Sequence, residues 1–254
     1  MKHNITTAIS ITIFALSGII FWETGFAWLV FIAIALAYMA VTAYGSFTIQ
    51  TNYFIKSINR GKRKAITLTF DDGPDPETTP LILDILKKKD VRATFFVIGK
   101  KAEKYPELLR RIDEEGHIVA NHSYSHHYMI AFFSKEKLKK DLDQCTSIIS
   151  GILGKTPKFF RPPFGVTNPR YASVLHDLKL VSVGWSIRSM DTKAKNKYEI
   201  INKVIAKLKT KDIVLLHDDR KVTADSIEDL IEHCLQKGLK FEPLSKLIQK
   251  EPYE

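Results

Sequence analysis

The chain has 254 residues, of which 45% are hydrophobic and 26% are charged. This length fits one globular domain with an appendage and leaves too little chain for two full domains. Its net charge of +10 is compatible with nucleic acid, an anionic lipid surface or an acidic polymer as a partner. It also fits a protein whose Lys-rich helix faces only keep it soluble.

Two long uncharged stretches lie at the N-terminus, at 5–21 and 26–47, with only WETG between them. The second is long enough to span a bilayer core, which takes about 20 residues, and the first is near the lower limit. Hydroxyl side chains in the first stretch can bond back to the helix backbone, so they do not prevent insertion. We therefore predict a hairpin of two transmembrane helices over residues 1–47.

Two alternatives for this hairpin are less favoured. A cleaved signal peptide does not fit well, because no small-x-small cleavage site follows the first stretch and a second apolar stretch comes directly after it. The other alternative is a buried hairpin of a soluble protein. Aromatic residues expected at membrane interfaces lie near the ends of the stretches, namely Trp22, Trp28, Tyr38 and Tyr44.

The charges around the hairpin predict its orientation. Lys2 precedes the first stretch, and residues 48–64 form a basic linker after the second. The basic residues of this linker are Lys56, Arg60, Lys62, Arg63 and Lys64. The positive-inside rule then favours a multi-pass cell-membrane protein whose remaining domain is cytoplasmic, provided that the first stretch spans. The run NRGKRK has no aromatic residues among its charges, so we expect no nucleic-acid partner.

Residues 65–254 alternate between short apolar runs and amphipathic stretches. Strands are predicted at 65–70, 93–98, 117–121, 159–161, 181–186 and 212–217. Helices are predicted at 79–89, 102–115, 135–153, 169–178, 199–208 and 224–237. Alternating βα units indicate a parallel sheet covered by helices. Six or seven such units predict an α/β barrel that is incomplete rather than eightfold.

Polar residues follow the predicted strands, where the functional groups of such barrels collect. The first strand ends in TFDDGP at 69–74, the third leads into NHSYSHH at 121–127, and the fourth leads into RPPFG at 161–165. The fifth ends near Trp185, and the last ends in LLHD at 215–218. Two Asp, three His and one Arg are thereby expected at one mouth, which indicates a catalytic site.

These residue types suggest metal-assisted hydrolysis. One carboxylate and the imidazoles of His122 and His126 would leave positions open on a divalent cation. The cation would keep one of two adjacent aspartates ionised and leave the other to handle protons. His217 could protonate a leaving group. Arg161 could orient a carboxylate through a bidentate pair.

The turn that follows Arg161 could donate to an oxyanion through its backbone. Pro162 and Pro163 have no N–H, so the donor is the N–H of Phe164 or of Gly165.

TFDDGP, HSYSH, RPPFG and LLHD, in this order and spacing, resemble the NodB-homology polysaccharide deacetylases, carbohydrate esterase family 4. The resemblance covers roughly residues 64–248. It implies a distorted (β/α)7-type barrel in the domain at 65–254. It also implies a substrate that carries N-acetyl groups on an amino-sugar polymer, such as chitin oligomers or peptidoglycan.

The resemblance implies one divalent metal ion, with zinc expected and cobalt, nickel, manganese or iron as alternatives. Asp72, His122 and His126 match the metal ligands. Asp71 matches the catalytic base that activates the metal-bound water. Tyr128, close to the histidines, could stack on a sugar ring, but packing is the expectation.

The resemblance assigns the other site residues in the same way. Arg161 matches the arginine that positions the base, and His217 matches the catalytic acid. Phe164 matches the residue whose N–H reaches the tetrahedral intermediate. Leu215 matches the apolar residue of the acetyl pocket, and Trp185 is expected beside it.

One motif departs from the family pattern. The family often shows W-x-x-D-x-x-D-W, whereas this chain has WSIRSMDT at 185–192. Asp191 keeps the later aspartate, which in the family holds the arginine of the third motif. Arg188 replaces the earlier acid and Thr192 replaces the tryptophan. Arg188 could pair with a nearby acid, which is the expectation, or meet an anionic substituent of the sugar.

The sequence thus predicts a membrane-anchored, metal-dependent hydrolase that removes N-acetyl groups from a glycan. One alternative is a catalytically weak or inactive membrane-bound glycan-binding homologue. Another is an Fe(II) oxygenase, which also uses two His and one carboxylate, although such enzymes usually have a double-stranded β architecture. The sequence makes no prediction of the oligomeric state.

Overall fold

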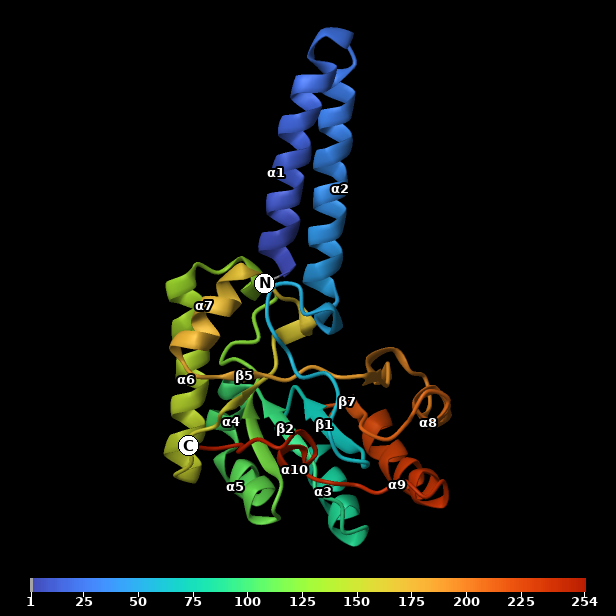
Figure 1. Cartoon of the computed structure of the whole chain (residues 1–254). Helices are drawn as coiled ribbons and strands as arrows, with labels where there is room; N and C mark the ends of the chain where they lie inside the picture. The colour runs from blue at the N-terminus through green and yellow to red at the C-terminus, as the bar shows by residue number, and fades with distance from the viewer. Residues whose placement is uncertain (1) are drawn as a thin grey trace.

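A computed structural model describes residues 2–254 of the chain (Figure 1). A hairpin of two long helices stands away from an α/β domain. Its helices are α1 (Lys2–Phe21) and α2 (Ala27–Phe47), joined through a 3-10 turn at Trp22–Thr24. The N-terminal end of α1 and the C-terminal end of α2 lie at the domain, and the connecting turn lies at the far tip.

The hairpin exposes its apolar side chains. Both helices are long and apolar enough to cross a membrane, and their most apolar windows are 6% and 0% buried. A hairpin buried within a soluble domain is therefore excluded. Between the helices, Phe14 stacks on Phe31 with ring centroids 4.4 Å apart. The Thr7 and Tyr38 hydroxyls lie 3.0 Å apart, so Tyr38 pairs across the hairpin, whereas the sequence suggested an interfacial position.

Residues 48–64, expected to be a linker, pack onto the domain. The buried apolar side chains of this segment include Ile49, Tyr53, Phe54 and Ile55. Ile58 forms a parallel bridge with Val183. A folded segment therefore joins the hairpin to the domain.

A parallel sheet of seven strands forms the domain, in the order β5-β4-β3-β2-β1-β7-β6. The strands are β1 (Thr67–Asp71), β2 (Thr94–Val97), β3 (Ile118–Asn121), β4 (Phe159–Phe160), β5 (Val181–Ser182), β6 (Ile187–Arg188) and β7 (Ile213–His217). The prediction of an incomplete α/β barrel is confirmed. The strand predicted at 181–186 ends at Ser182, because the chain leaves β5 there and crosses to the opposite edge of the sheet, where β6 follows at Ile187–Arg188. Two residues are too few for a periodicity to reveal β6.

Helices cover the outside of the sheet (Figure 1). They are α3 (Thr79–Lys88), α4 (Gly99–Lys104), α5 (Pro106–Glu114), α6 (Lys135–Leu153), α7 (Pro169–Asp177), α8 (Lys197–Ile205) and α9 (Lys221–Gln236). A short last helix, α10 (Leu244–Ile248), lies at the inner face instead. The helix predicted at 102–115 is broken at Tyr105, because the Pro106 ring cannot continue a helix from the preceding turn. The five-residue α10 was not predicted.

The inner face of the sheet is closed at one end. Ile66, just before β1, forms a bridge with Phe241, and the Lys62 N–H donates to the Leu247 carbonyl of α10. Leu244 and Leu247 of α10 are buried in the same cluster as Phe96 of β2. The N-terminal ends of the strands are thus plugged by apolar side chains, and the polar site can form at their C-terminal ends.

Candidate active site

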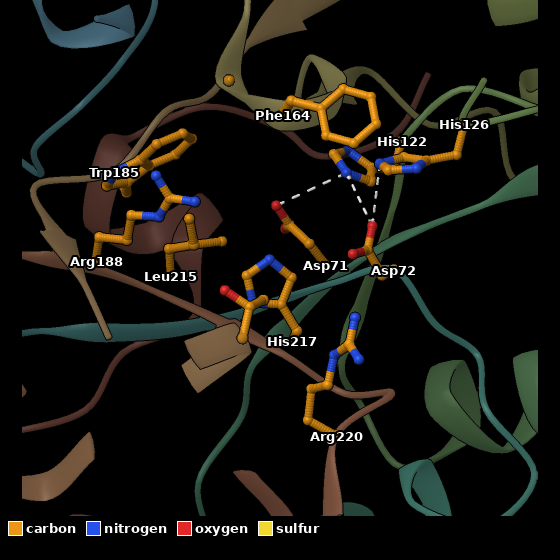
Figure 2. A pocket seen from close by; sticks show the side chains of 12 residues that line it. Asp71, Asp72, His122, His126, Phe164, Trp185, Arg188, Leu215, His217 and Arg220 are labelled. Carbon is orange, nitrogen blue, oxygen red and sulfur yellow. Dashed lines mark ion pairs between the residues drawn. The ribbon is translucent and has the colours of Figure 1, made fainter. Parts of the chain in front are cut away.

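The strand register brings the predicted residues together. β1 and β7 pair Thr69 with Leu215 and Asp71 with His217. Residues two apart on a strand share a face, so all four side chains lie on one face. Asp71, Leu215 and His217 border a cavity of about 230 Å³ (Figure 2). The side chains that line it are Asp71, Asp72, His122, His126, Phe164, Gly165, Trp185, Arg188, Thr192, Leu215, His217 and Arg220. Of the predicted site residues, only Arg161 and Asp191 are not in this lining, and each bonds to a residue that is.

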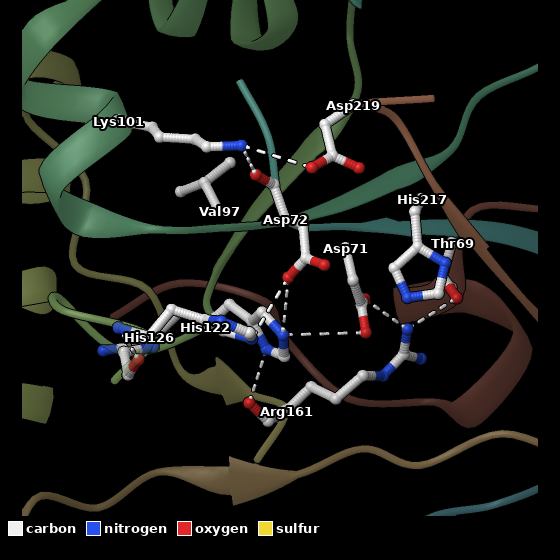
Figure 3. A network of polar contacts seen from close by, with 12 residues as sticks. Thr69, Asp71, Asp72, Val97, Lys101, His122, His126, Arg161, His217 and Asp219 are labelled. Carbon is white, nitrogen blue, oxygen red and sulfur yellow. Dashed lines mark hydrogen bonds and ion pairs between the residues drawn. The ribbon is translucent and has the colours of Figure 1, made fainter. Parts of the chain in front are cut away.

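Arg161 is fully buried and forms the predicted ion pair with Asp71, with Nη1 2.7 Å from Oδ1. The expected bidentate geometry is absent. Nε donates instead to the Val183 carbonyl and Nη2 to the Gly184 carbonyl, in the segment between β5 and β6. Nη1 also donates to the Thr69 hydroxyl. Oδ1 of Asp71 is thus fixed by Arg161. Oδ2, the other oxygen of Asp71, lies 3.9 Å from Nε2 of His122 (Figure 3).

Asp72, His122 and His126 bring three ligand atoms within 4.8 Å of one another. Asp72 Oδ1 lies 3.4 Å from His122 Nε2 and 3.2 Å from His126 Nε2. The Asp72 backbone has a φ of 74°, in the left-handed region, which costs energy for a residue other than Gly. Its buried Oδ1 has no hydrogen-bond partner within residues 2–254. Such a group needs a partner of some kind.

The donor set fits a divalent cation. His122 Nδ1 lies 2.8 Å from the Arg161 carbonyl, and because a carbonyl only accepts, Nδ1 is assigned the proton. In the neutral ring, Nε2 then directs a lone pair at the Asp72 carboxylate, which is repulsive unless positive charge lies between them. Oxygen and nitrogen donors of this kind bind zinc and related metals.

The pKa values of His122 and His126 also indicate that the three-ligand set favours a single positive charge. Burial opposes the charged form of His122, but Asp71 and Asp72 raise its pKa. For His126, burial and the charge of His122 lower the pKa to about 4. Burial of Asp72 is likewise outweighed by the neighbouring imidazoles, and its pKa lies well below its usual range.

His217 pairs with Asp191 on the other side of the cavity. His217 Nδ1 lies 2.8 Å from Asp191 Oδ1, and Oδ2 accepts from the His217 backbone N–H and from the Thr223 hydroxyl. Burial lowers the pKa of His217, but the hydrogen bond and the charge of Asp191 outweigh it and raise the pKa to about 9. Asp191 was expected to hold Arg161; it holds His217 instead, and this imidazole is protonated at neutral pH.

Two residues that support the TFDDGP loop were missed. Asp218 is fully buried, and its Oδ2 accepts from the Thr79 hydroxyl at 2.6 Å. A Cβ at Gly73 would lie 1.9 Å from that oxygen, so only glycine fits there. Lys101 Nζ donates to the Asp72 carbonyl at 2.6 Å (Figure 3). The acid directly after His217 was the available signal for Asp218, and Lys101 had none.

Phe164 forms the opposite wall from Trp185 and Leu215 (Figure 2). The Gly165 N–H donates to the Pro162 carbonyl, which leaves the Phe164 N–H as the donor of this turn. The Phe164 ring lies 4.6 Å from the His126 ring, measured between centroids.

Arg188 and Arg220 bring positive charge to the cavity. Arg220 pairs with Asp219 at 3.1 Å. Arg188 is exposed and forms no ion pair with an acid anywhere in residues 2–254. The expected structural pairing of Arg188 is therefore wrong.

Comparisons with known proteins give the family. The sequence model of the family described as "Polysaccharide deacetylase" matches residues 58–183. A peptidoglycan-N-acetylglucosamine deacetylase of Bacillus cereus is 34% identical over 188 residues, which cover 72% of this chain and 68% of that protein. The chain belongs to the polysaccharide deacetylase family. The chain is also 37% identical over 185 residues to the peptidoglycan-N-acetylmuramic acid deacetylase PdaC of Bacillus subtilis. The matched residues cover 73% of this chain and 39% of PdaC.

Solved structures confirm the fold of the deacetylase. A crystal structure of a peptidoglycan N-acetylglucosamine deacetylase matches with a TM-score of 0.74 and 31% identity, covering 78% of this chain and 95% of the other. A pseudoenzyme of carbohydrate esterase family 4 from Bacillus anthracis matches with a TM-score of 0.71 and 26% identity, covering 76% and 68%. The fold is thus shared by active and inactive relatives, and the side chains of the site determine the activity. The protein is a glycan deacetylase, a hydrolase of carbon–nitrogen bonds.

Proposed function

We propose that the protein is a membrane-anchored, divalent-metal-dependent hydrolase that removes N-acetyl groups from an amino-sugar glycan of the peptidoglycan or chitin type. One observation carries the proposal: the Arg161–Asp71 pair, the three-ligand set and the Asp191–His217 pair border a single cavity. The relatives named as peptidoglycan deacetylases support the substrate class.

Asp72, His122 and His126 would hold the metal ion. Zinc is the expected metal, and cobalt, nickel, manganese or iron are alternatives that nitrogen and oxygen ligands also accept. When bound, a divalent ion polarises the acetyl carbonyl and lowers the pKa of its water.

Asp71 acts as the base that takes a proton from the attacking water. Its Oδ1 is held by Arg161, and this charge-assisted bond orients the carboxylate. Oδ2, on the side of the metal ligands, is the oxygen that receives the proton.

His217 acts as the acid. As the new C–O bond forms and the C–N bond breaks, its imidazolium protonates the departing nitrogen, so that the products are acetate and a free amine. Asp191 keeps this imidazole charged and oriented. The Phe164 N–H donates to the developing oxyanion, and Leu215 and Trp185 surround the acetyl methyl group.

The exposed apolar hairpin supports membrane anchoring, with two spans and both ends on one side. The charge pattern favours the cytoplasmic side. Two of the basic residues behind that inference form ion pairs within the domain, Arg60 with Asp212 and Arg63 with Glu242, so the charge argument is weaker than the sequence alone suggested. Protease accessibility of the domain in intact cells tests the side.

Acetate release tests the enzymatic proposal. The full chain in detergent should release acetate from chitopentaose, lose this activity with a chelator and recover it with Zn²⁺. Turnover that a chelator does not affect would refute the metal role. Binding of chitopentaose without acetate release would refute the proposed turnover and leave glycan binding as the function.

A further inference from the structure

The end of the hairpin is bonded to two walls of the cavity. The Ser46 carbonyl at the end of α2 accepts from the Thr167 N–H at 2.9 Å, and the Ser46 hydroxyl donates to the Thr167 carbonyl at 2.7 Å. Thr167 belongs to the loop at 161–167 that carries the Phe164 wall. On the other wall, Gln50 Nε2 donates to the Trp185 carbonyl at 3.1 Å. The cavity is therefore held at a fixed distance from the end of α2.

An apolar groove lies where the hairpin and the cavity meet. Its volume is about 630 Å³. The large apolar side chains that line it, here called the aromatic groove, are Phe47, Tyr128, Phe132, Phe164 and Val166. Four of them are highly exposed, Phe47 by 73%, Tyr128 by 77%, Phe132 by 73% and Phe164 by 53%. The packing expected of Tyr128 is limited to a stack on the His127 ring, with centroids 4.6 Å apart. An exposed cluster of this kind marks an interaction site.

The aromatic groove is continuous with the cavity, because Phe164 lines both. A ligand whose sugar lies beside the three-ligand set can therefore extend past Phe164 into the groove. The groove ends at Phe47, the last residue of α2.

The position of the groove indicates the surroundings of its ligand. The hairpin is apolar and exposed as far as Phe47, so in a bilayer the boundary between hydrocarbon and water falls near this residue. Aromatic side chains are enriched at that boundary. Because residues 48–64 are folded onto the domain, the mouth of the cavity stays close to the lipid surface.

We propose that the substrate is an N-acetylated amino sugar carried on a membrane lipid. The sugar enters the cavity and the apolar chain lies along the aromatic groove, with its far end in the bilayer. This inference rests on the proposed deacetylation and anchoring and specifies their substrate. Aromatic rings can also stack on the sugars of a soluble polymer, which is the competing occupant. The lipid is favoured because the groove begins at the end of an apolar helix.

The test compares two substrates of the full chain in phosphatidylcholine nanodiscs. One is a synthetic N-acetylglucosaminyl glycolipid with a sixteen-carbon chain in the same disc, and the other is chitopentaose in the buffer. The kcat/KM measured by acetate release should be at least about tenfold higher for the glycolipid than for chitopentaose. The reason is that burial of one large apolar side chain against the lipid contributes enough free energy to change kcat/KM roughly tenfold.

The double variant Tyr128→Ser, Phe132→Ser should lower the glycolipid-to-chitopentaose ratio by roughly tenfold or more. Both side chains are exposed, so folding should be retained. Tyr198→Ser on α8 is a matched control, since Tyr198 is 63% exposed and lies outside the groove. It should leave the ratio unchanged.

Four outcomes contradict the inference. An equal or higher kcat/KM for chitopentaose refutes the lipid-linked substrate and leaves the deacetylase proposal intact. A double variant that loses activity on both substrates alike assigns the groove to the glycan. If neither substrate releases acetate, the proposed turnover is refuted. If the chain does not enter the discs, the proposed membrane anchor is refuted. Each of these two results also refutes the inference about the substrate.

Discussion

The pairing of His217 with Asp191 leads to a prediction about pH. In the folded protein the pKa of His217 is about 9, compared with an ordinary value of 6.5, and the difference corresponds to about 3 kcal/mol of preference for the charged ring. Asp191→Asn removes the largest of the negative charges that raise this pKa, while burial still disfavours the imidazolium. The pKa of His217 should then fall toward 6.5.

The consequence for catalysis follows from the proposed role as an acid, which requires the protonated ring. At pH 8 the ring is about 90% protonated with a pKa of about 9 and about 3% protonated with a pKa of 6.5. Asp191→Asn should therefore lower kcat/KM roughly 30-fold at pH 8 and less than about twofold at pH 6. The assay is the pH profile of acetate release, in which the alkaline limb moves toward neutral pH.

Thr223→Val provides the control, because it removes one hydrogen bond to Asp191 without changing the charge. Its alkaline limb should stay near that of the native enzyme. An Asp191→Asn enzyme that loses activity equally at pH 6 and pH 8 would show that Asp191 only maintains the fold, and the reasoning would be wrong.

The same pKa predicts how stability depends on pH. A group whose pKa is raised on folding stabilises the protein fully below its unfolded value, 6.5, and this stabilisation is lost as the pH rises through the folded value of about 9. In chelator-treated protein, the contribution of His217 to the free energy of unfolding should fall by up to about 3 kcal/mol across this range. Denaturation of native and Asp191→Asn protein at pH 6 and pH 9 measures it. An equal pH dependence in the two proteins would contradict the assignment.

Three further predictions concern the cavity and its support. Asp71→Asn should lower kcat by about 10²–10⁴-fold while calorimetry still detects Zn²⁺ binding; full activity would refute the base assignment. Gly73→Ala should destabilise the protein by about 1–3 kcal/mol in thermal unfolding, because the new methyl group would meet the buried Asp218 carboxylate. Its control, Gly151→Ala, has open space in helix α6 and should stabilise by about 0.5–1 kcal/mol; equal effects would exclude the steric explanation. Arg188→Ala should leave the melting temperature unchanged and lower kcat/KM roughly tenfold for sugars bearing a carboxylate or phosphate relative to neutral ones; an unchanged ratio would mean that Arg188 does not contact the substrate.

The fold and the positions of the site residues could be predicted from the sequence for a simple physical reason. Strand and helix periodicities indicate the alternating order, and parallel strands bring their C-terminal residues to one mouth. That is why TFDDGP, the His122–His126 pair and LLHD could be placed together from the order of the predicted strands alone.

The hydrogen bonds and ion pairs between particular side chains could not be predicted in the same way. Asp191 could equally have met Arg161 or His217, and only the path of the chain from β5 to β6 decides between them. The packing of residues 48–64 was hidden because its basic charges resemble those of a linker. The role of Asp218 could not be predicted, because a buried carboxyl cannot be distinguished from an exposed one by its neighbours in sequence.

Arg161 contacts both halves of the site with different atoms. Its guanidinium holds Asp71, and its carbonyl accepts from the ring of His122. A movement of this residue would misalign the proposed base and a proposed metal ligand together, so substitutions of Asp71 and His122 should be non-additive in a double-mutant cycle, by about 0.5–3 kcal/mol. With these proposed roles, displacement of the Arg161 backbone would weaken proton transfer and ion binding in one step.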